Sequence, residues 1–204
     1  MLKASALSFR LQNANLREAN LQEANLIKAN LQNANLRDAN LQEANLRDAN
    51  LQNANLVEAN LQNANLREAN LQEANLIKAN LQKANLRDAN LQKAILLGAN
   101  LKGANLQEAN LQKANLREAN LQEAILLFTD LRNTRGFDQE CLGGDQPPLL
   151  CNVALPEGFK DRDTLKDQDC DKVAAELFKR YPQSFYSLEE AEQDMNELRE
   201  KKWE

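Results

Sequence analysis

The chain has 204 residues, of which 43% are hydrophobic and only 4% aromatic, and its formal net charge is −5. Aromatic side chains are too few to build a core, so any core must consist mostly of Leu and Ala. Residues 10–135 contain 15 Lys and Arg against 13 Asp and Glu, whereas residues 136–204 contain 9 against 17. A nearly neutral repeat region lacks the clustered Lys and Arg that nucleic acid requires. We therefore expect no nucleic-acid ligand.

The N-terminal residues precede the repeat and offer little apolar surface. Leu2 and Leu7 predict only a small N-terminal plug over residues 1–8. The segment lacks the apolar stretch of a signal peptide, and no apolar run in the chain approaches the roughly 18 residues of a membrane span. We expect no membrane insertion, while the earlier removal of a leader peptide stays open.

A five-residue repeat dominates the chain. Leu occupies every fifth position from Leu11 to Leu131, in 25 consecutive registers, and Ala stands two positions before it from Ala14 to Ala124. Asn lies between them, interrupted at Ile95, so the unit is Ala-Asn-Leu-x-x. A period of five advances an α-helix by about 500°, so the Leu residues would never form one stripe. In an extended segment, Ala and Leu instead point to one side, and turning units coil the chain around them.

The uninterrupted Ala-Asn-Leu-x-x units closely resemble the pentapeptide-repeat family over residues 9–135. The resemblance implies an all-β solenoid, a right-handed quadrilateral β-helix with four units per coil and an inward Leu. With 25 units, the rod would have about six coils and a length on the order of 30 Å. A small α-helical C-terminal cap completes the expected fold.

Residues 20 apart should then lie above one another, which allows the surface to be compared column by column. One column contains Arg47, Arg67 and Arg87 beside acidic residues, and we expect a solvated lattice of opposite charges there. The opposite column replaces Arg in three consecutive coils, and Ile95 projects to the same side. The expected apolar strip consists of Val57, Ile77, Ile95 and Leu97. Two interpretations stay open: neutral variation that suits a strand ladder, or a surface for a protein partner or self-association.

The repeat degenerates from Ile125, and residues 136–204 are predicted to form a loop and a two-helix C-terminal cap. Gly and Pro are frequent over residues 136–160, which predicts an irregular loop. Apolar residues at helical spacing predict one helix over residues 169–181 and a second after Ser187. A solenoid needs such a cover, because its last coil exposes core and unpaired strand edges.

Cysteines occur only in the tail, at Cys141, Cys151 and Cys170. Their spacing does not fit a zinc site, and the acidic run over residues 161–171 lacks the Gly and Glu of a calcium loop, so no metal is expected. One disulfide could brace the cap, which would imply an oxidising compartment, or the thiols could be reduced. Lumenal members of the resembled family carry helical caps, which favours the periplasm or thylakoid lumen slightly over the cytoplasm.

The sequence favours a non-enzymatic structural or protein-interaction module that presents a rigid rod-like surface. The chain has no His, the charged repeat positions point outward and the interior is aliphatic, so neither catalytic nor cofactor-binding residues are expected. Some members of the family resemble duplex DNA and inhibit topoisomerases, so the alternative is a nucleic-acid-mimicking regulator of a DNA-binding enzyme. That role calls for an acidic rod. The partner is not identified by the sequence.

Overall fold

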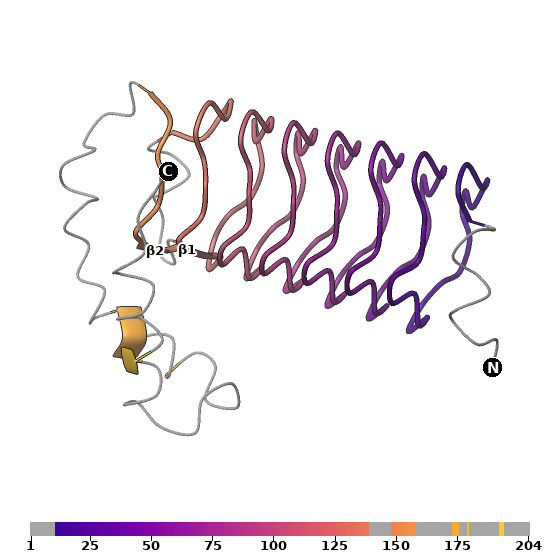
Figure 1. Ribbon diagram of the computed structural model, residues 1–204, viewed down its shortest axis with the longest axis horizontal. Coiled ribbons are helices and arrows are strands. Elements are labelled where there is room, and N and C mark those ends of the chain that lie inside the picture. The colour runs from indigo at the N-terminus through magenta and orange to yellow at the C-terminus, as the bar shows by residue number, and fades with distance from the viewer. Residues whose placement is uncertain (1–10, 139–147, 158–172, 176–178, 180–191, 194–204) are drawn as a thin grey trace.

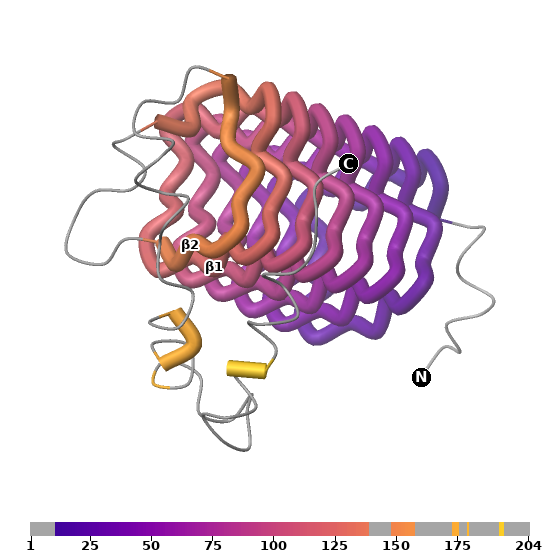
Figure 2. Tube along the Cα trace, turned by 60° about the vertical axis from the view of Figure 1, so that its left-hand side comes forward, coloured from indigo at the N-terminus to yellow at the C-terminus, as the bar shows by residue number. Residues whose placement is uncertain are grey.

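The computed structural model describes residues 11–138, 148–157, 173–175, 179 and 192–193. From Leu11 onward the chain winds into a stack of coils (Figures 1 and 2). Parallel bridges join residues 20 positions apart, from the Asn15–Asn35 pair to the Asn115–Arg135 pair. Each coil therefore contains four five-residue units and has four sides. The predicted β-helical solenoid is confirmed.

The central Asn of each unit links its coil to both neighbouring coils through its backbone. The Asn35 N–H donates to the Ala14 carbonyl at 2.9 Å, and the Leu16 N–H donates to the Asn35 carbonyl at 2.7 Å. This pattern recurs on all four sides up to the last coil. Each side contributes a single bridging residue, which is too short a pairing to count as a full strand.

Leu and Ala fill the interior, as the five-residue spacing predicted. The Leu side chains from Leu31 to Leu116 and the Ala side chains from Ala34 to Ala114 are at most 1% exposed. Complete burial of one Leu contributes roughly 2 kcal/mol. Burial repeated in every unit is therefore the main stabilising term of the rod.

Tight turns separate the four sides. The Leu61 carbonyl accepts a hydrogen bond from the Ala64 N–H at 3.0 Å, and the same bond recurs in the other units. The non-glycine residues just before Ala, from Asn13 to Glu123, have φ between 54° and 60°. This left-handed conformation costs most L-residues about 1 kcal/mol. Gly98 and Gly103 occupy two of these positions with φ of 64° and 67°, so both serve the turn.

The C-terminal end of the stack is covered by a returning segment. Strand β1, Ile125–Leu127, pairs in parallel with strand β2, Leu149–Cys151, in the register Ile125 to Leu149 (Figure 1). The Leu131 N–H continues the pairing by donating to the Ala154 carbonyl at 2.8 Å. The sequence-based prediction of an irregular loop is wrong over Leu149–Cys151, and Ala154 also forms a parallel bridge with Asp130. Gly and Pro density indicated turns on both sides of this short apolar segment, but its pairing partner lies far away in the sequence.

Little of the predicted helical cap falls within the described residues. Residues 173–175, 179 and 192–193 are helical, and Val173 and Ala174 are buried. The remainder of both predicted helices, and the plug predicted over residues 1–8, lie outside the described residues. Within the described part of the chain, we find no helix with the length and apolarity needed to cross a membrane.

Candidate protein-contact surface

The apolar strip, defined as Val57, Ile77, Ile95 and Leu97, lies in consecutive coils on one side of the rod. The Ile77 carbonyl accepts from the Glu58 N–H at 2.9 Å, and the Leu97 carbonyl accepts from the Lys78 N–H at 2.9 Å. Residues 57, 77 and 97 are thus stacked in direct register. Ile95 bridges Asn75 and Asn115 in the adjacent column. The structure therefore places the four residues in the register that the sequence predicted, and their role as a contact surface stays a prediction.

Ile95 is the most exposed member of this strip. Its exposed fraction is 37%, and among the described residues no other large hydrophobic side chain is as exposed. Val57, Ile77 and Leu97 are half-buried. The side chains offer a narrow apolar surface along three coils.

Ile95 also replaces an Asn whose amide closes the adjacent turn. The Asn55 and Asn75 Oδ1 atoms accept hydrogen bonds from the N–H groups of Val57 and Ile77 at 3.2 and 3.3 Å. An isoleucine side chain has no acceptor, so the equivalent bond to the Leu97 N–H is absent. A side chain–backbone bond of this kind contributes about 1 kcal/mol. Ile95 thus loses a hydrogen bond and exposes apolar surface at the same site.

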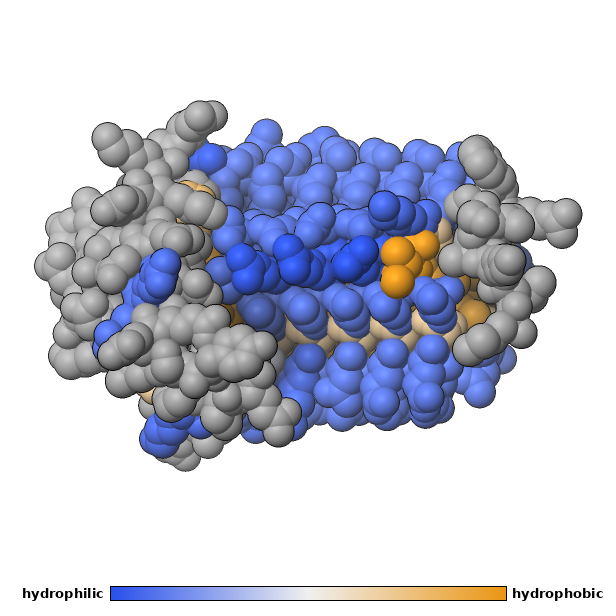
Figure 3. Space-filling view, turned by 60° about the horizontal axis from the view of Figure 1, so that its bottom comes forward, coloured by the Kyte–Doolittle hydropathy of each residue, from blue (hydrophilic) through white to orange (hydrophobic). Residues whose placement is uncertain are grey.

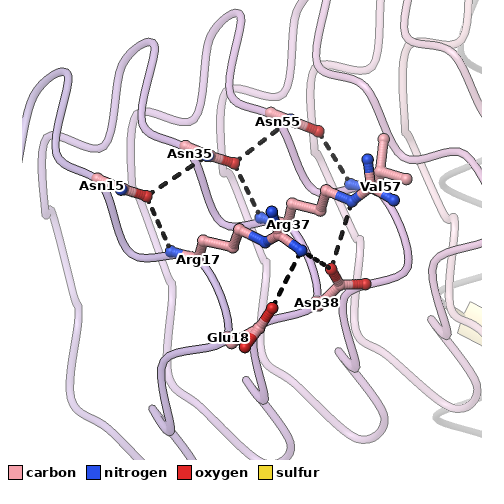
Figure 4. A network of polar contacts seen from close by, with 8 residues as sticks. All are labelled: Asn15, Arg17, Glu18, Asn35, Arg37, Asp38, Asn55 and Val57. Carbon is pink, nitrogen blue, oxygen red and sulfur yellow. Dashed lines mark hydrogen bonds and ion pairs between the residues drawn. The ribbon is translucent and has the colours of Figure 1, made fainter.

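The same side of the rod shows the regular arrangement in its first coils (Figure 4). The Asn35 amide donates to Asn15 Oδ1 at 3.4 Å and the Asn55 amide to Asn35 Oδ1 at 3.3 Å, which forms a ladder along the stack. Arg17 pairs with Glu18 at 3.1 Å beside the ladder. The coils that hold Arg17 and Arg37 are polar and internally paired on this side, whereas the apolar strip begins at Val57.

The opposite column is the charged lattice that the sequence predicted. Arg47 pairs with Asp48 at 3.4 Å, and Arg67 pairs with Glu68 at 3.1 Å. These side chains are 25% to 49% exposed, so each pair contributes little to stability. The side of the rod seen in Figure 3 is hydrophilic along most of its length, with one apolar spot next to its N-terminal end.

Asp130 anchors a polar cluster that sequence reasoning missed. It replaces the usual Asn and is 5% exposed, and its Oδ2 accepts hydrogen bonds from Gln112 Nε2 at 2.5 Å and from Arg132 Nη2 at 2.8 Å. Burial raises the pKa of the Asp130 carboxyl, but the hydrogen bonds from Arg132 and Gln112 and the Arg132 charge outweigh this effect and lower the pKa below its ordinary value. The signal in the sequence was the change from Asn to Asp two residues before an Arg.

The described residues include one of the three cysteines and can be searched for metal-binding groups. Cys151 is 1% exposed and disulfide-bonded, whereas Cys141 and Cys170 lie outside the described residues. No group of three or more His, Cys, Asp or Glu that could hold a metal ion occurs in the part of the chain that the structure describes.

The repeat region matches a family model for pentapeptide repeats over residues 10–42, 34–72, 44–82, 69–107 and 99–135. These segments together span more than half of the chain. The chain belongs to the pentapeptide-repeat family. None of the curated proteins matches its sequence.

Several solved structures of pentapeptide-repeat proteins are similar to this chain. HetL from Nostoc sp. strain PCC 7120, involved in heterocyst differentiation regulation, is 32% identical, with 70% of this chain and 72% of HetL covered and a TM-score of 0.40. A trypsin-treated variant of QnrB1, a plasmid-mediated fluoroquinolone resistance protein, is 21% identical, with 69% and 76% covered and a TM-score of 0.47. A protein from the Arabidopsis thaliana thylakoid lumen is 24% identical, with 57% and 71% covered and a TM-score of 0.23.

Proposed function

We propose that this pentapeptide-repeat protein is a non-enzymatic interaction module that binds a protein partner through the apolar strip of Val57, Ile77, Ile95 and Leu97. The rod supports this role because four-sided coils with a filled Leu and Ala interior hold surface side chains at fixed positions. The described repeat surface consists mainly of paired charges, amide ladders and the apolar strip.

Ile95 is the observation that carries the proposal. Three residues replace the central Asn between residues 15 and 130, namely Ile95, Ile125 and Asp130. Ile125 is 5% exposed beneath β2, and Asp130 is hydrogen-bonded to Arg132, so both contribute to the C-terminal end of the rod. Ile95 has no such role, since its side chain is exposed and its turn has lost a hydrogen bond. A bound partner would cover this apolar surface and offset that loss.

A triple variant of the strip tests the proposal. Replacing Val57, Ile77 and Leu97 with Arg restores the residue type found elsewhere in the column, so the rod should fold normally. The control places three Arg residues in the same coils on an adjacent side, at Gln52, Gln72 and Gln92. Both variants, and the unchanged protein, are used to capture proteins from the native host.

The expected result is a partner that the unchanged protein and the control retain and that the strip variant loses by at least about tenfold. Circular dichroism and thermal denaturation should give the same fold and stability for all three proteins. Equal retention of every captured protein by the strip variant and the control would contradict the proposed contact surface.

The alternative function is a nucleic-acid-mimicking regulator of a DNA-binding enzyme such as a topoisomerase. Its support is limited, because the region over residues 10–135 has 15 basic and 13 acidic residues and so lacks the negative charge of duplex DNA. A gyrase supercoiling assay tests it directly. Inhibition at micromolar protein would favour this alternative over the interaction module.

We also infer the finer organisation: the right-handed rod of about six coils over residues 9–135 that the family resemblance implied, and, from the residue pattern, a plug over residues 1–8 and a two-helix cap within residues 136–204. A location in the periplasm or thylakoid lumen is favoured over the cytoplasm. The disulfide at Cys151 supports an oxidising compartment. Limited proteolysis of the full chain and localisation of a tagged protein in the native host test these assignments.

A further inference from the structure

The side of the rod that holds the apolar strip, named the strip side, presents three columns of side chains. The middle column is the amide ladder that begins at Asn15 and is interrupted by Ile95. The turn that ends the side supplies the strip column, in which Arg17 and Arg37 stand next to the ladder (Figure 4). The corner at which the side begins supplies the corner column, which consists of Asn13, Asn33, Asn53, Glu73, Lys93 and Lys113.

Charge and apolar surface alternate between the same two coils of the strip side. Glu73 and Ile77 lie in one coil, and Lys93 and Leu97 take the same two places in the next coil. The Lys93 ammonium pairs with the Glu73 carboxylate at 2.8 Å, and these side chains stay 54% and 42% exposed, so both can reach a second molecule. An axis that exchanges the two coils therefore brings opposite charges together in one column and apolar side chains together in the other.

We propose that the apolar strip binds a second copy of this chain, which lies antiparallel to the first with the two strip sides face to face. The two-fold axis runs across the strip side, midway between the coils of Ile77 and Leu97. It places Glu73 opposite the partner's Lys93 and Ile77 opposite the partner's Leu97. This inference rests on the proposed function, because it names the partner of the same surface.

The centre of this contact is apolar. Ile95 lies half a coil spacing, about 2.4 Å, from the axis, so it faces the partner's Asn75 and, one coil away, the partner's Ile95. Ile77, Ile95 and Leu97 of both copies then form one cluster, which removes from water the apolar surface that a single rod exposes. The chain climbs only a quarter of the coil spacing, about 1.2 Å, along one side, so the same axis serves all three columns.

The flanking coils meet without like charges. Val57 faces the partner's Arg117, and Asn53 faces the partner's Lys113, because each lies one coil beyond the central pair. The contact spans only one side of the coils from Val57 to Arg117, which is small for a protein interface. We therefore expect a weak dimer that forms at micromolar concentration.

Other registers of the two rods lose this match. Moving the axis by half a coil towards either end sets Glu73 against the partner's Glu73 or Lys93 against the partner's Lys93. A parallel pair of rods sets the corner column against the strip column and buries charges on apolar side chains. The antiparallel register between Ile77 and Leu97 is thus the one that matches both charge and apolarity.

Charge reversal tests the pairing in the full-length protein, with the molar mass measured by sedimentation equilibrium from low to high micromolar concentration. The unchanged protein should approach twice the 23.0 kDa of one chain. Glu73→Lys leaves two basic side chains at the corner and Lys93→Glu leaves two acidic ones, so each variant alone should associate at least about tenfold more weakly. An equimolar mixture of the two variants should recover the dimer, because a basic corner then faces an acidic one. The lost ion pair is exposed, so circular dichroism should show both variants folded.

Two further variants separate the strip side from the rest of the surface. Leu97→Arg places the residue type usual in this column into the apolar cluster, and it should weaken association at least about tenfold. Lys83→Glu is the matched control, because it reverses an exposed charge at the opposite corner of the Ile77 coil. It should leave the association unchanged.

The outcomes distinguish this inference from the proposed function. A monomer at every concentration would overturn the second copy as the partner, while the capture experiment with the strip variant decides separately whether the strip binds another protein. A dimer that persists in both charge variants, or in Leu97→Arg, uses a different surface and would contradict the proposal. A mixture of the two charge variants that stays monomeric would rule out the antiparallel register.

Discussion

Truncation of one central leucine tests directly whether the leucines of the five-residue repeat point into the core. Leu76 is 0% exposed in the middle of the stack, whereas Leu16 in the first coil is partly exposed. Leu76→Ala removes three carbon atoms from a fully buried site. At about 0.8 kcal/mol for each, with a further cost for the cavity, we expect a loss of about 3 kcal/mol in the free energy of unfolding. Leu16→Ala removes side-chain atoms that are already partly exposed and leaves no closed cavity. We therefore expect it to lower the free energy of unfolding by only about 1 kcal/mol.

Guanidinium denaturation followed by far-ultraviolet circular dichroism measures both variants against the unchanged protein. Because adjacent coils stabilise one another, the loss at Leu76 should weaken the coils on both sides of it. A cost below about 1 kcal/mol at Leu76, or equal costs at the two positions, would refute the inward placement of the leucines. Fully helical spectra would refute the whole architecture.

Three further substitutions test the turns, the C-terminal cluster and the amide ladders. Glu58 has φ of 58°, a conformation that glycine adopts without the cost of a side chain. Glu58→Gly should therefore raise the free energy of unfolding by about 0.5–1 kcal/mol and with it the melting temperature. An unchanged or lower melting temperature would contradict strain in this turn. The pKa of Asp130 is lowered from its ordinary 3.8 in the folded state, so its stabilising contribution is present above that pH and is lost as the pH falls through the folded pKa. The unfolding free energy of the unchanged protein should therefore fall more steeply below about pH 4 than that of Asp130→Asn, and parallel pH profiles would argue against the Arg132 contact. The Asn60 amide donates to Asn40 Oδ1 at 3.2 Å and accepts from the Asn80 amide at 3.3 Å. Asn60 and Asn65 each also accept one backbone N–H at 3.2 Å, so chemical denaturation should show Asn60→Ala costing about 1 kcal/mol more than Asn65→Ala. Equal costs would show that the ladder adds nothing.

Most of the rod was predictable from local spacing. A period of five is incompatible with a helical stripe, and the alternation of Ala, Asn and Leu places Ala and Leu on one side of an extended segment. The columns followed from a coil of 20 residues, which the resemblance supplied and the Asn15–Asn35 bridge confirms. The apolar strip was predictable for the same reason, since it needs only the register.

The C-terminal contacts were not predictable in this way. Leu149, Leu150 and Cys151 form a short apolar run that fits several environments equally well. Their pairing with Ile125–Leu127 depends on the return path of the intervening chain and carries no periodic signal. The cluster of Asp130 with Arg132 and Gln112 likewise joins residues from two coils, although the loss of Asn at position 130 marked the site.

The sequence alone determined the interior of this protein, because a repeated apolar pair at five-residue spacing has one way to bury itself: coils stacked on one another. It also determined which coils carry the strip of Val57, Ile77 and Leu97. Only the tertiary structure decided how the last coil is covered by β2 and how Asp130 is joined to Arg132 and Gln112. Those features depend on contacts between segments distant in the chain, where the free energy comes from pairing partners rather than from any local pattern.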